Sequence, residues 1–196
     1  MGGRVIGFDP GKKSKKGDHS FAYSINDGSG NLLDSDYIET TLDTVTVEEL
    51  ESYRNEMFCL LEWMNIQDDD TIIIERFIPR PGRGMGSSAE YINLMISGLV
   101  YTLVDMGVAK DKIILVTASV WKTRFKKEFK GKLPPEIYPK VNGLDKHQAD
   151  AFGMTAYVLL RREDLAKRQK EKDDKKLARE EKKLKQQKEK SRNSKK

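Results

Sequence analysis

The apolar run at residues 71–75 (TIIIE) limits the fold of this chain more than any other feature. Its β-branched side chains are typical of a strand that is buried on both faces and covered by helices, so the sequence predicts an α/β fold. The three acids before it, at 68–70, fit a solvated turn better than a metal site. The run ends in Glu75, and a buried carboxylate needs a cation or a local partner such as Arg76 or Arg80.

A second strand with an acidic end opens the chain. Residues 4–9 (RVIGFD) form a short apolar strand that ends in Asp9 and stops at Pro10 and Gly11. The end of a buried strand lies at the edge of its sheet, so a rigid element holds Asp9 at a mouth instead of in the core. If this strand pairs with residues 71–75 in a mixed sheet, the two acids come close together.

The other periodicities complete a β-β-β-α-β-α-β-α-α order. Turn residues at 26–30 (NDGSG) join the second and third strands into an antiparallel meander. The further elements are strands at about 19–25, 31–40 and 112–116, helices at about 47–66 and 88–106, a short aromatic helix after Thr117 or Ser119, and a helix from 145.

The helix at 88–106 is apolar on all sides, which is typical of a helix that is buried on more than one side. One side must cover the sheet. The other side can meet a second subunit, with Ser97 and Gly98 allowing close approach. We therefore expect a homodimer through this helix.

The last helix brings a histidine and an aspartate to its first turns. Asp145 and Gln148 fit a capping box, which makes His147 and Asp150 neighbours on one face. Against the two acidic strand ends, this face would complete a cluster of carboxylates that repel one another unless a cation neutralises them. Two Mg²⁺ ions, or Mn²⁺ in their place, suit such oxygen ligands and drive phosphodiester hydrolysis. The candidate catalytic residues and metal ligands are Asp9, Glu75, His147 and Asp150.

Basic residues follow both strands and line the short aromatic helix. By itself each loop fits a solvated turn, but beside the acids these side chains could hold a phosphate backbone. Phe77 and Ile78 could pack on the core or wedge between the bases of a distorted duplex. The candidate DNA-contacting residues are Lys12, Lys13, Lys15, Lys16, Phe77, Arg80, Arg83, Lys122, Arg124 and Lys126.

Charge is divided unevenly along the chain. Residues 161–196 hold 17 Lys/Arg and 8 Asp/Glu, whereas the other residues hold 19 and 23. A basic extension of a folded domain indicates a polyanionic partner, most often nucleic acid, although a solvated extension without a partner fits equally well. We divide the chain into a domain of residues 1–160 and a Lys/Glu-rich tail of residues 161–196, either helical or disordered.

The sequence also indicates the compartment. No apolar run approaches the roughly 20 residues of a membrane span, and a strand instead of a signal peptide begins close to Met1. Cys59 is the single cysteine, which excludes an internal disulfide and fits a reducing compartment. Its apolar neighbours predict a buried thiol. We expect a cytoplasmic protein with no membrane partner.

Three stretches of the chain resemble the motifs of the RuvC family of Holliday junction resolvases. They are residues 5–11 (VIGFDPG), 72–77 (IIIERF) and 147–152 (HQADAF), and the likeness covers nearly all of residues 4–160, including 117–122 (TASVWK). The resemblance implies an RNase H-like fold with a mixed five-stranded sheet. It also implies a homodimer and Mg²⁺-dependent, symmetric nicking of four-way DNA junctions that leaves 5′-phosphate and 3′-hydroxyl ends.

Position by position, the resemblance makes Asp9, Glu75 and Asp150 the family's carboxylates and places His147 where members have Asp or His. Phe77 or Ile78 falls where the family has an aromatic residue at the junction centre. The Gly/Arg-rich loop at 77–88 and the Lys/Glu-rich tail depart from the common pattern. The chain looks more like the divergent members of phages than like the bacterial form, and a phage protein would work in the host cytoplasm.

Three other functions compete with this prediction. The opening strand also occurs in sugar kinase and actin-like ATPases, which need two such lobes and a far longer chain. An RNase H-like nuclease could act on RNA or on flaps instead of junctions. A binding module could keep the fold without activity, but competent residues at all four ligand positions argue against it.

Overall fold

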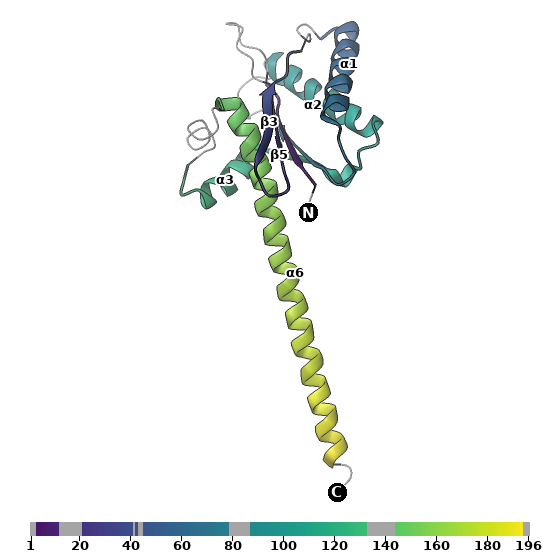
Figure 1. The fold of residues 1–196 in the computed structure, drawn as a ribbon, viewed down its shortest axis with the longest axis vertical. Coiled ribbons are helices and arrows are strands. Elements are labelled where there is room, and N and C mark those ends of the chain that lie inside the picture. Colours follow the sequence, from purple (N-terminus) through teal and green to yellow (C-terminus); the bar gives the residue numbers. More distant parts are fainter. Residues whose placement is uncertain are drawn as a thin grey trace. The chain divides into compact units, whose positions relative to one another are not determined.

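The computed structural model describes residues 3–11, 21–40, 42, 45–78, 87–132 and 144–193, with only the backbone described at 87–88 and 178–193. Contacts divide the chain into two compact units, Met1–Leu159 and Leu160–Lys196. The first unit holds a five-stranded sheet with helices on both of its faces (Figure 1). Over these described ranges, no helix has both the length and the apolar character that a membrane crossing requires.

The strands of the sheet are β1 (Val5–Asp9), β2 (Ala22–Asn26), β3 (Leu32–Tyr37), β4 (Thr71–Arg76) and β5 (Ile113–Thr117). They lie in the order β3-β2-β1-β4-β5. The first three pair antiparallel, and β4 and β5 join them in parallel to β1, which confirms the predicted mixed sheet. In the β1–β4 pair Phe8 lies opposite Ile74, so Asp9 and Glu75 end neighbouring strands at the same edge.

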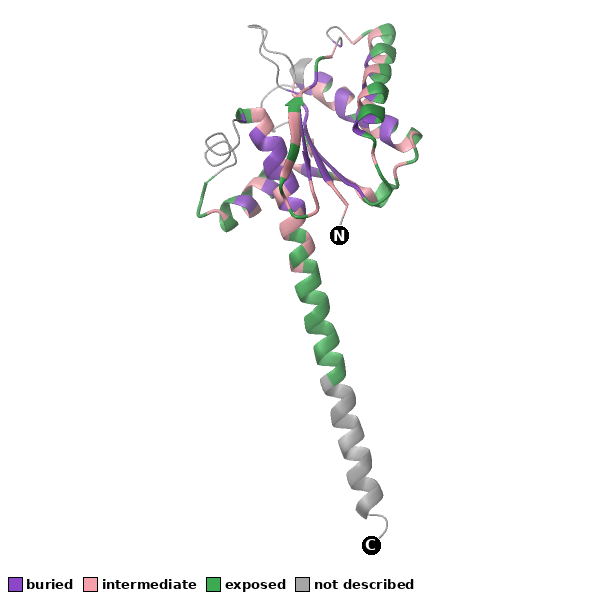
Figure 2. Cartoon of the chain, viewed as in Figure 1, coloured by how far each residue is buried: buried purple, intermediate pink, exposed green. Residues whose placement is uncertain are grey.

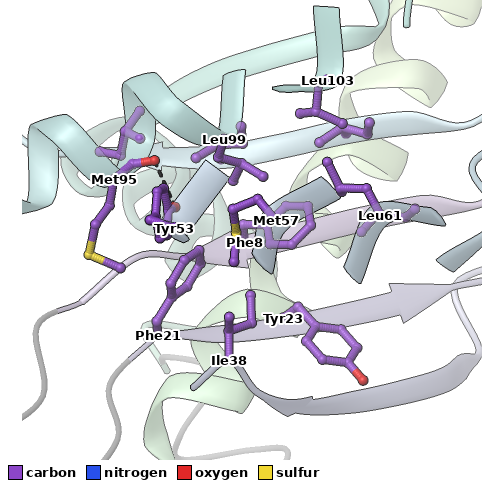
Figure 3. Close-up of a cluster of buried hydrophobic side chains, with 14 of the residues drawn as sticks. Phe8, Phe21, Tyr23, Ile38, Tyr53, Met57, Leu61, Met95, Leu99 and Leu103 are labelled. Carbon is purple, nitrogen blue, oxygen red and sulfur yellow. Dashed lines mark hydrogen bonds between the residues drawn. The ribbon is translucent and has the colours of Figure 1, made fainter. Parts of the chain in front are cut away.

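Helices α1 (Val47–Met64) and α2 (Ser87–Asp105) cover one face of the sheet. Figure 3 shows Phe8 of β1 meeting Met57 of α1 and Leu99 of α2 in this core. Tyr53 adds a polar tie, because its hydroxyl donates to the Met95 carbonyl at 2.9 Å. These residues are deeply buried, and Figure 2 colours the buried positions of the helices and the sheet purple. This layer is therefore the rigid support of the sheet.

Helix α3 (Ala118–Glu128) and the first turns of α6 (Lys146–Asn193) cover the opposite face, and the 3₁₀ turn Lys110–Lys112 precedes β5. Gly7 shows how closely α6 approaches the sheet. A Cβ atom at Gly7 would lie 2.4 Å from the Ala151 carbonyl oxygen, so only glycine lets α6 rest on β1 here. This contact positions the first turns of α6 beside the end of β1.

Two expectations about small residues were wrong. Cys59 is exposed instead of buried, because the buried face of α1 is formed by Tyr53, Met57, Leu61 and Met64. Gly98 packs inside the chain, since a Cβ there would lie 2.7 Å from the ring of Tyr53. Its small size therefore serves the α1–α2 contact.

The acids at 68–70 do not all lie in a solvated turn. Asp70 is buried, and its carboxylate accepts from the Arg4 side chain, from the Arg4 backbone N–H at 3.0 Å and from the Gln67 N–H at 2.9 Å. Arg4 also donates to the carbonyls of Met64 and Asn65 at the end of α1. This ion pair, buried at Asp70 and partly exposed at Arg4, thus joins the residue before β1, the end of α1 and the approach to β4.

Asp70→Asn is expected to lower the free energy of unfolding by about 2 kcal/mol, because it removes the charge that Arg4 and two backbone N–H groups share. Urea unfolding measures the loss. Asp69→Asn is the matched control, since Asp69 is exposed in the same turn. Equal stabilities for the two variants would contradict a structural role for Asp70.

Candidate active site

The alternation of side chains along β1 and β4 brings Asp9 and Glu75 to the same side of the sheet. Phe8 and Ile74 point to the α1–α2 core, so the next residues, Asp9 and Glu75, point to the side that α3 and α6 cover. Asp9 is buried and Glu75 is half-buried. The two carboxylates therefore lie under the first turns of α3 and α6.

The start of α6 holds His147 against Asp9. The predicted capping box is confirmed: Asp145 Oδ1 accepts from the Gln148 N–H at 3.1 Å, and Gln148 Oε1 accepts from the Asp145 N–H at 3.2 Å. Asp145 Oδ1 also accepts from the His147 N–H at 2.9 Å. His147 Nδ1 then lies 2.9 Å from Asp9 Oδ2. The helix cap thus determines which way the imidazole faces.

Asp150, one turn further along α6, pairs with a lysine of α3. Lys122 Nζ donates to Asp150 Oδ2 at 2.8 Å, and it lies 4.9 Å from the centroid of the Trp121 ring. Asp150 itself is 5% exposed, and its other oxygen, Oδ1, is buried with no hydrogen-bond partner among the residues that the structure describes. The site therefore contains a buried carboxylate oxygen that is ready to accept a ligand.

Glu75 has a different partner on the same helix. The indole Nε1 of Trp121 donates to Glu75 Oε2 at 2.7 Å. Trp121 is fully buried and packs edge-to-face on Phe125. Because this packing fixes the indole, the Trp121 N–H holds one oxygen of Glu75 in place and leaves the other to the site.

The electrostatics of the cluster reflect burial and crowding of negative charge. Burial raises the pKa of Glu75 from 4.5 to about 7, and the neighbouring charge of Asp9 adds to the shift. Burial also raises the pKa of Asp150, while the hydrogen bond from Lys122 opposes it. The hydrogen bond to Asp9 raises the pKa of His147, although burial acts the other way. A cation would lower the repulsion among these groups.

The donor chemistry fits a divalent cation, but the ligands are not gathered around one point. Within the described ranges, no three His, Cys, Asp or Glu side chains form a group that could hold a metal ion. Each carboxylate instead contacts a different side chain: Asp9 contacts His147, Glu75 contacts Trp121, and Asp150 contacts Lys122. The orphaned Asp150 Oδ1 and the excess of carboxylate charge are the features that suit Mg²⁺.

The other predicted site residues lie in different environments. Phe77 and Ile78 follow β4 and are 38% and 55% exposed, so neither is buried in the core. The Lys122 ammonium pairs with Asp150. Arg124 Nη2 lies 3.9 Å from Glu128 Oε2, and Lys126 is exposed. The predicted contacts that fall outside the described residues are Lys12, Lys13, Lys15, Lys16, Arg80 and Arg83.

Sequence reasoning missed the roles of Trp121 and Lys122 toward the carboxylates. One signal could have found them. β5 runs parallel to β4, with Thr117 opposite Arg76, so the helix after β5 begins at the edge where Glu75 ends its strand. The topology therefore places the first turn of α3 beside the acids.

Metal-free protein is expected to lose stability as the pH rises through the window between 4.5 and about 7. The folded state binds a proton on Glu75 more tightly than the unfolded state does, because burial raises the pKa of Glu75 from 4.5 to about 7. Protonation of Glu75 therefore stabilises the fold fully below the unfolded pKa of 4.5, and this contribution is lost as the pH rises through the folded pKa of about 7. The loss is on the order of 3 kcal/mol for Glu75, from about 1.4 kcal/mol per pKa unit. Urea unfolding of the wild type and Glu75→Gln at pH 4 and pH 8 measures it; equal pH dependence in both proteins would contradict it.

The fold has counterparts among solved structures. No family model and no curated protein matches the sequence. The chain is similar to Thermus thermophilus RuvC in complex with a Holliday junction substrate, with a TM-score of 0.56, 12% identity and coverage of 82% of this chain and 95% of that one. Another structure of Thermus thermophilus RuvC has a TM-score of 0.55 and 14% identity, with coverage of 81% of this chain and 95% of that one.

The yeast mitochondrial Holliday junction resolvase is also similar, with a TM-score of 0.54 and 15% identity over 80% of this chain and 76% of that one. At such low identity the likeness establishes the fold alone. The first compact unit therefore has the RNase H-like fold of RuvC, as the sequence motifs predict.

Proposed function

We propose that this chain is a divalent-metal-dependent endonuclease that cleaves four-way DNA junctions and related branched DNA. The single observation that carries the proposal is a shared sheet edge on a RuvC-like fold. Asp9 and Glu75 come from two neighbouring strands there, His147 contacts Asp9, and the charges of Asp9 and Asp150 both act on Glu75. The substrate class is supported by the similar structures, which are Holliday junction resolvases, one of them in complex with its substrate.

The protein's own groups would prepare this site for catalysis. Asp9, Glu75 and Asp150 present carboxylate oxygens as ligands, and His147 holds Asp9 or serves as a further ligand. Trp121 keeps Glu75 oriented through its N–H. Two bound Mg²⁺ ions, or Mn²⁺, would supply an activated water and stabilisation of the leaving 3′ oxygen. Hydrolysis would leave 5′-phosphate and 3′-hydroxyl ends that a ligase can join.

The surroundings of the site support a branched substrate. Phe77 and Ile78 are exposed two and three residues after Glu75, where apolar side chains can contact unstacked bases. Symmetric nicking of a junction needs two sites, and a homodimer through α2 would provide them. On α2, Ser97 is exposed and Tyr101 is 69% exposed, which leaves this side available to a second copy. Such an enzyme would act in the cytoplasm, in the host's if a phage encodes it.

A comparison of substrates tests this function. The full chain is incubated with a synthetic four-way junction, a three-way junction, a flap and an RNA–DNA hybrid, each with Mg²⁺ and with chelator. We expect paired nicks in the four-way junction, only with Mg²⁺, and products that DNA ligase can seal. Preferred cleavage of the hybrid or the flap would favour the alternative nucleases, and binding without any cleavage would favour a non-catalytic module.

A further inference from the structure

In the second compact unit, basic and acidic residues lie mostly on different sides of the helix. Helix α6 continues through this unit to Asn193, and the described side chains from 165 to 177 are all exposed. An α-helix has 3.6 residues per turn, so each residue is rotated by about 100° from the last. Positions 161, 165, 168, 172, 175 and 176 consequently share one side. We call this side the basic face; it consists of Arg161, Leu165, Arg168, Lys172, Lys175 and Lys176.

The rest of the circumference has the opposite balance. All five acids of residues 161–177 lie off the basic face, together with only three basic residues. The acids are Glu163, Asp164, Glu171, Asp173 and Asp174, and the basic residues are Arg162, Lys167 and Lys170. The basic face thus has a net charge of +5 and the remainder −2. Asp164 and Glu171 border the basic face, but no acid lies within it.

The sequence continues this separation beyond the side chains that the structure describes. Three of the seven basic residues at 178–193 recur at the spacing of the basic face, namely Arg179, Lys183 and Lys190, whereas none of the three acids there does. From Arg161 to Lys176 the row of basic residues is about 22 Å long at 1.5 Å per residue. A partner must therefore offer negative charge along an extended line.

We propose that the basic face binds the phosphate backbone of a DNA duplex, independently of sequence. A duplex carries a negative charge about every 1.7 Å along its axis, and its major groove admits an α-helix. An anionic membrane fits less well, because a helix that lies on a membrane has a broad apolar face. Among the side chains of this unit that the structure describes, the exposed large apolar residues are Leu165 and Leu177, which lie on different sides of the helix.

This inference rests on the proposed function in one respect: DNA is taken as the polyanion because the proposed substrate is DNA. A junction extends from its crossover as duplex arms, so the enzyme meets duplex DNA wherever it meets its substrate. Tethering a duplex-binding helix to the nuclease unit would make the second contact intramolecular and strengthen overall binding. Because such contacts are electrostatic, the added affinity would decrease steeply with salt.

Two triple variants of the full chain test the basic face with identical changes of charge. The face variant carries Arg168→Gln, Lys172→Gln and Lys175→Gln. The control variant carries Arg162→Gln, Lys167→Gln and Lys170→Gln, so each loses one arginine and two lysines from the same helix. Circular dichroism checks that both keep their helix. Binding to a linear duplex is then measured without divalent metal at several salt concentrations.

We expect the face variant to lower the slope of log K against log salt by about 2 to 3 and the affinity for duplex at low salt by at least about tenfold. The control variant should stay close to the wild type. Equal losses in both variants would mean unspecific charge attraction and would overturn the proposal, as would no loss in either. Loss of binding to phosphatidylserine vesicles, with duplex binding unchanged, would assign the face to membranes instead.

These assays distinguish a failure of the basic-face proposal from a failure of the proposed function. Duplex binding in the absence of metal does not depend on cleavage, so it can be retained even if no branched DNA is cut. Conversely, Asp9→Asn should abolish junction cleavage while binding to the linear duplex keeps the salt slope of the wild type, because Asp9 is not part of the basic face.

Discussion

Asp9→Asn is expected to abolish cleavage of a four-way junction while junction binding remains nearly unchanged. The substitution keeps the size of the side chain and a carbonyl oxygen that can face His147, but it removes the charge that a divalent ligand set needs. Loss of a group that stabilises charge in a transition state typically lowers the rate by about 10² to 10³-fold, and loss of a shared metal ligand should exceed that range.

Single-turnover cleavage of a labelled junction measures this effect, and a gel-shift assay with chelator measures binding. Asp111→Asn is the control, because Asp111 is an exposed acid in the short 3₁₀ turn before β5. It should leave both measurements unchanged. Full activity of the Asp9→Asn enzyme would refute the assignment of Asp9 and, with it, the proposed site.

The elements that carry the acids could be predicted from the sequence for a physical reason. A run such as residues 72–74 is stable only when both faces are buried, which makes β4 central and places its end at an open edge. The same reasoning applies to β1 and Asp9. The capping box at Asp145 then determined where α6 begins, and hence that His147 and Asp150 share its first turns.

The partners of these acids were beyond sequence reasoning. Trp121 lies in the predicted aromatic helix, but the sequence pattern does not reveal which acceptor its indole N–H reaches. A lysine such as Lys122 is usually exposed at the surface, yet its ammonium pairs with the buried Asp150. Asp70 looked like its exposed neighbours because its partner Arg4 lies 66 positions away in the chain. Each of these contacts is set by tertiary packing.

Lys122 leads to the second prediction of large effect. Its ammonium is the cation that the structure places on Asp150, in a cluster where Asp9 and Glu75 also carry negative charge. Lys122→Met keeps the length of the stem and removes the charge, which leaves Asp150 buried with neither oxygen paired to a residue in the described part of the chain. Breaking a buried pair by removing one partner typically costs about 3 to 5 kcal/mol, and the partial exposure of Lys122 favours the lower value.

In metal-free buffer, Lys122→Met is therefore expected to lower the melting temperature by roughly 6 to 12 °C, from about 2 to 4 °C per kcal/mol for a chain of this size. Lys126→Met, an exposed change on the same helix, is the control and should have little effect.

Addition of Mg²⁺ should then stabilise Lys122→Met more than the wild type, because a like charge no longer competes for the carboxylates. Melting curves over a Mg²⁺ titration measure this difference without reference to activity. A smaller Mg²⁺ response in Lys122→Met than in the wild type would show that Lys122 supports metal binding instead of opposing it. The site would then need the lysine and the metal together, and Lys122 would belong with Asp9, Glu75 and Asp150 as part of one charged assembly.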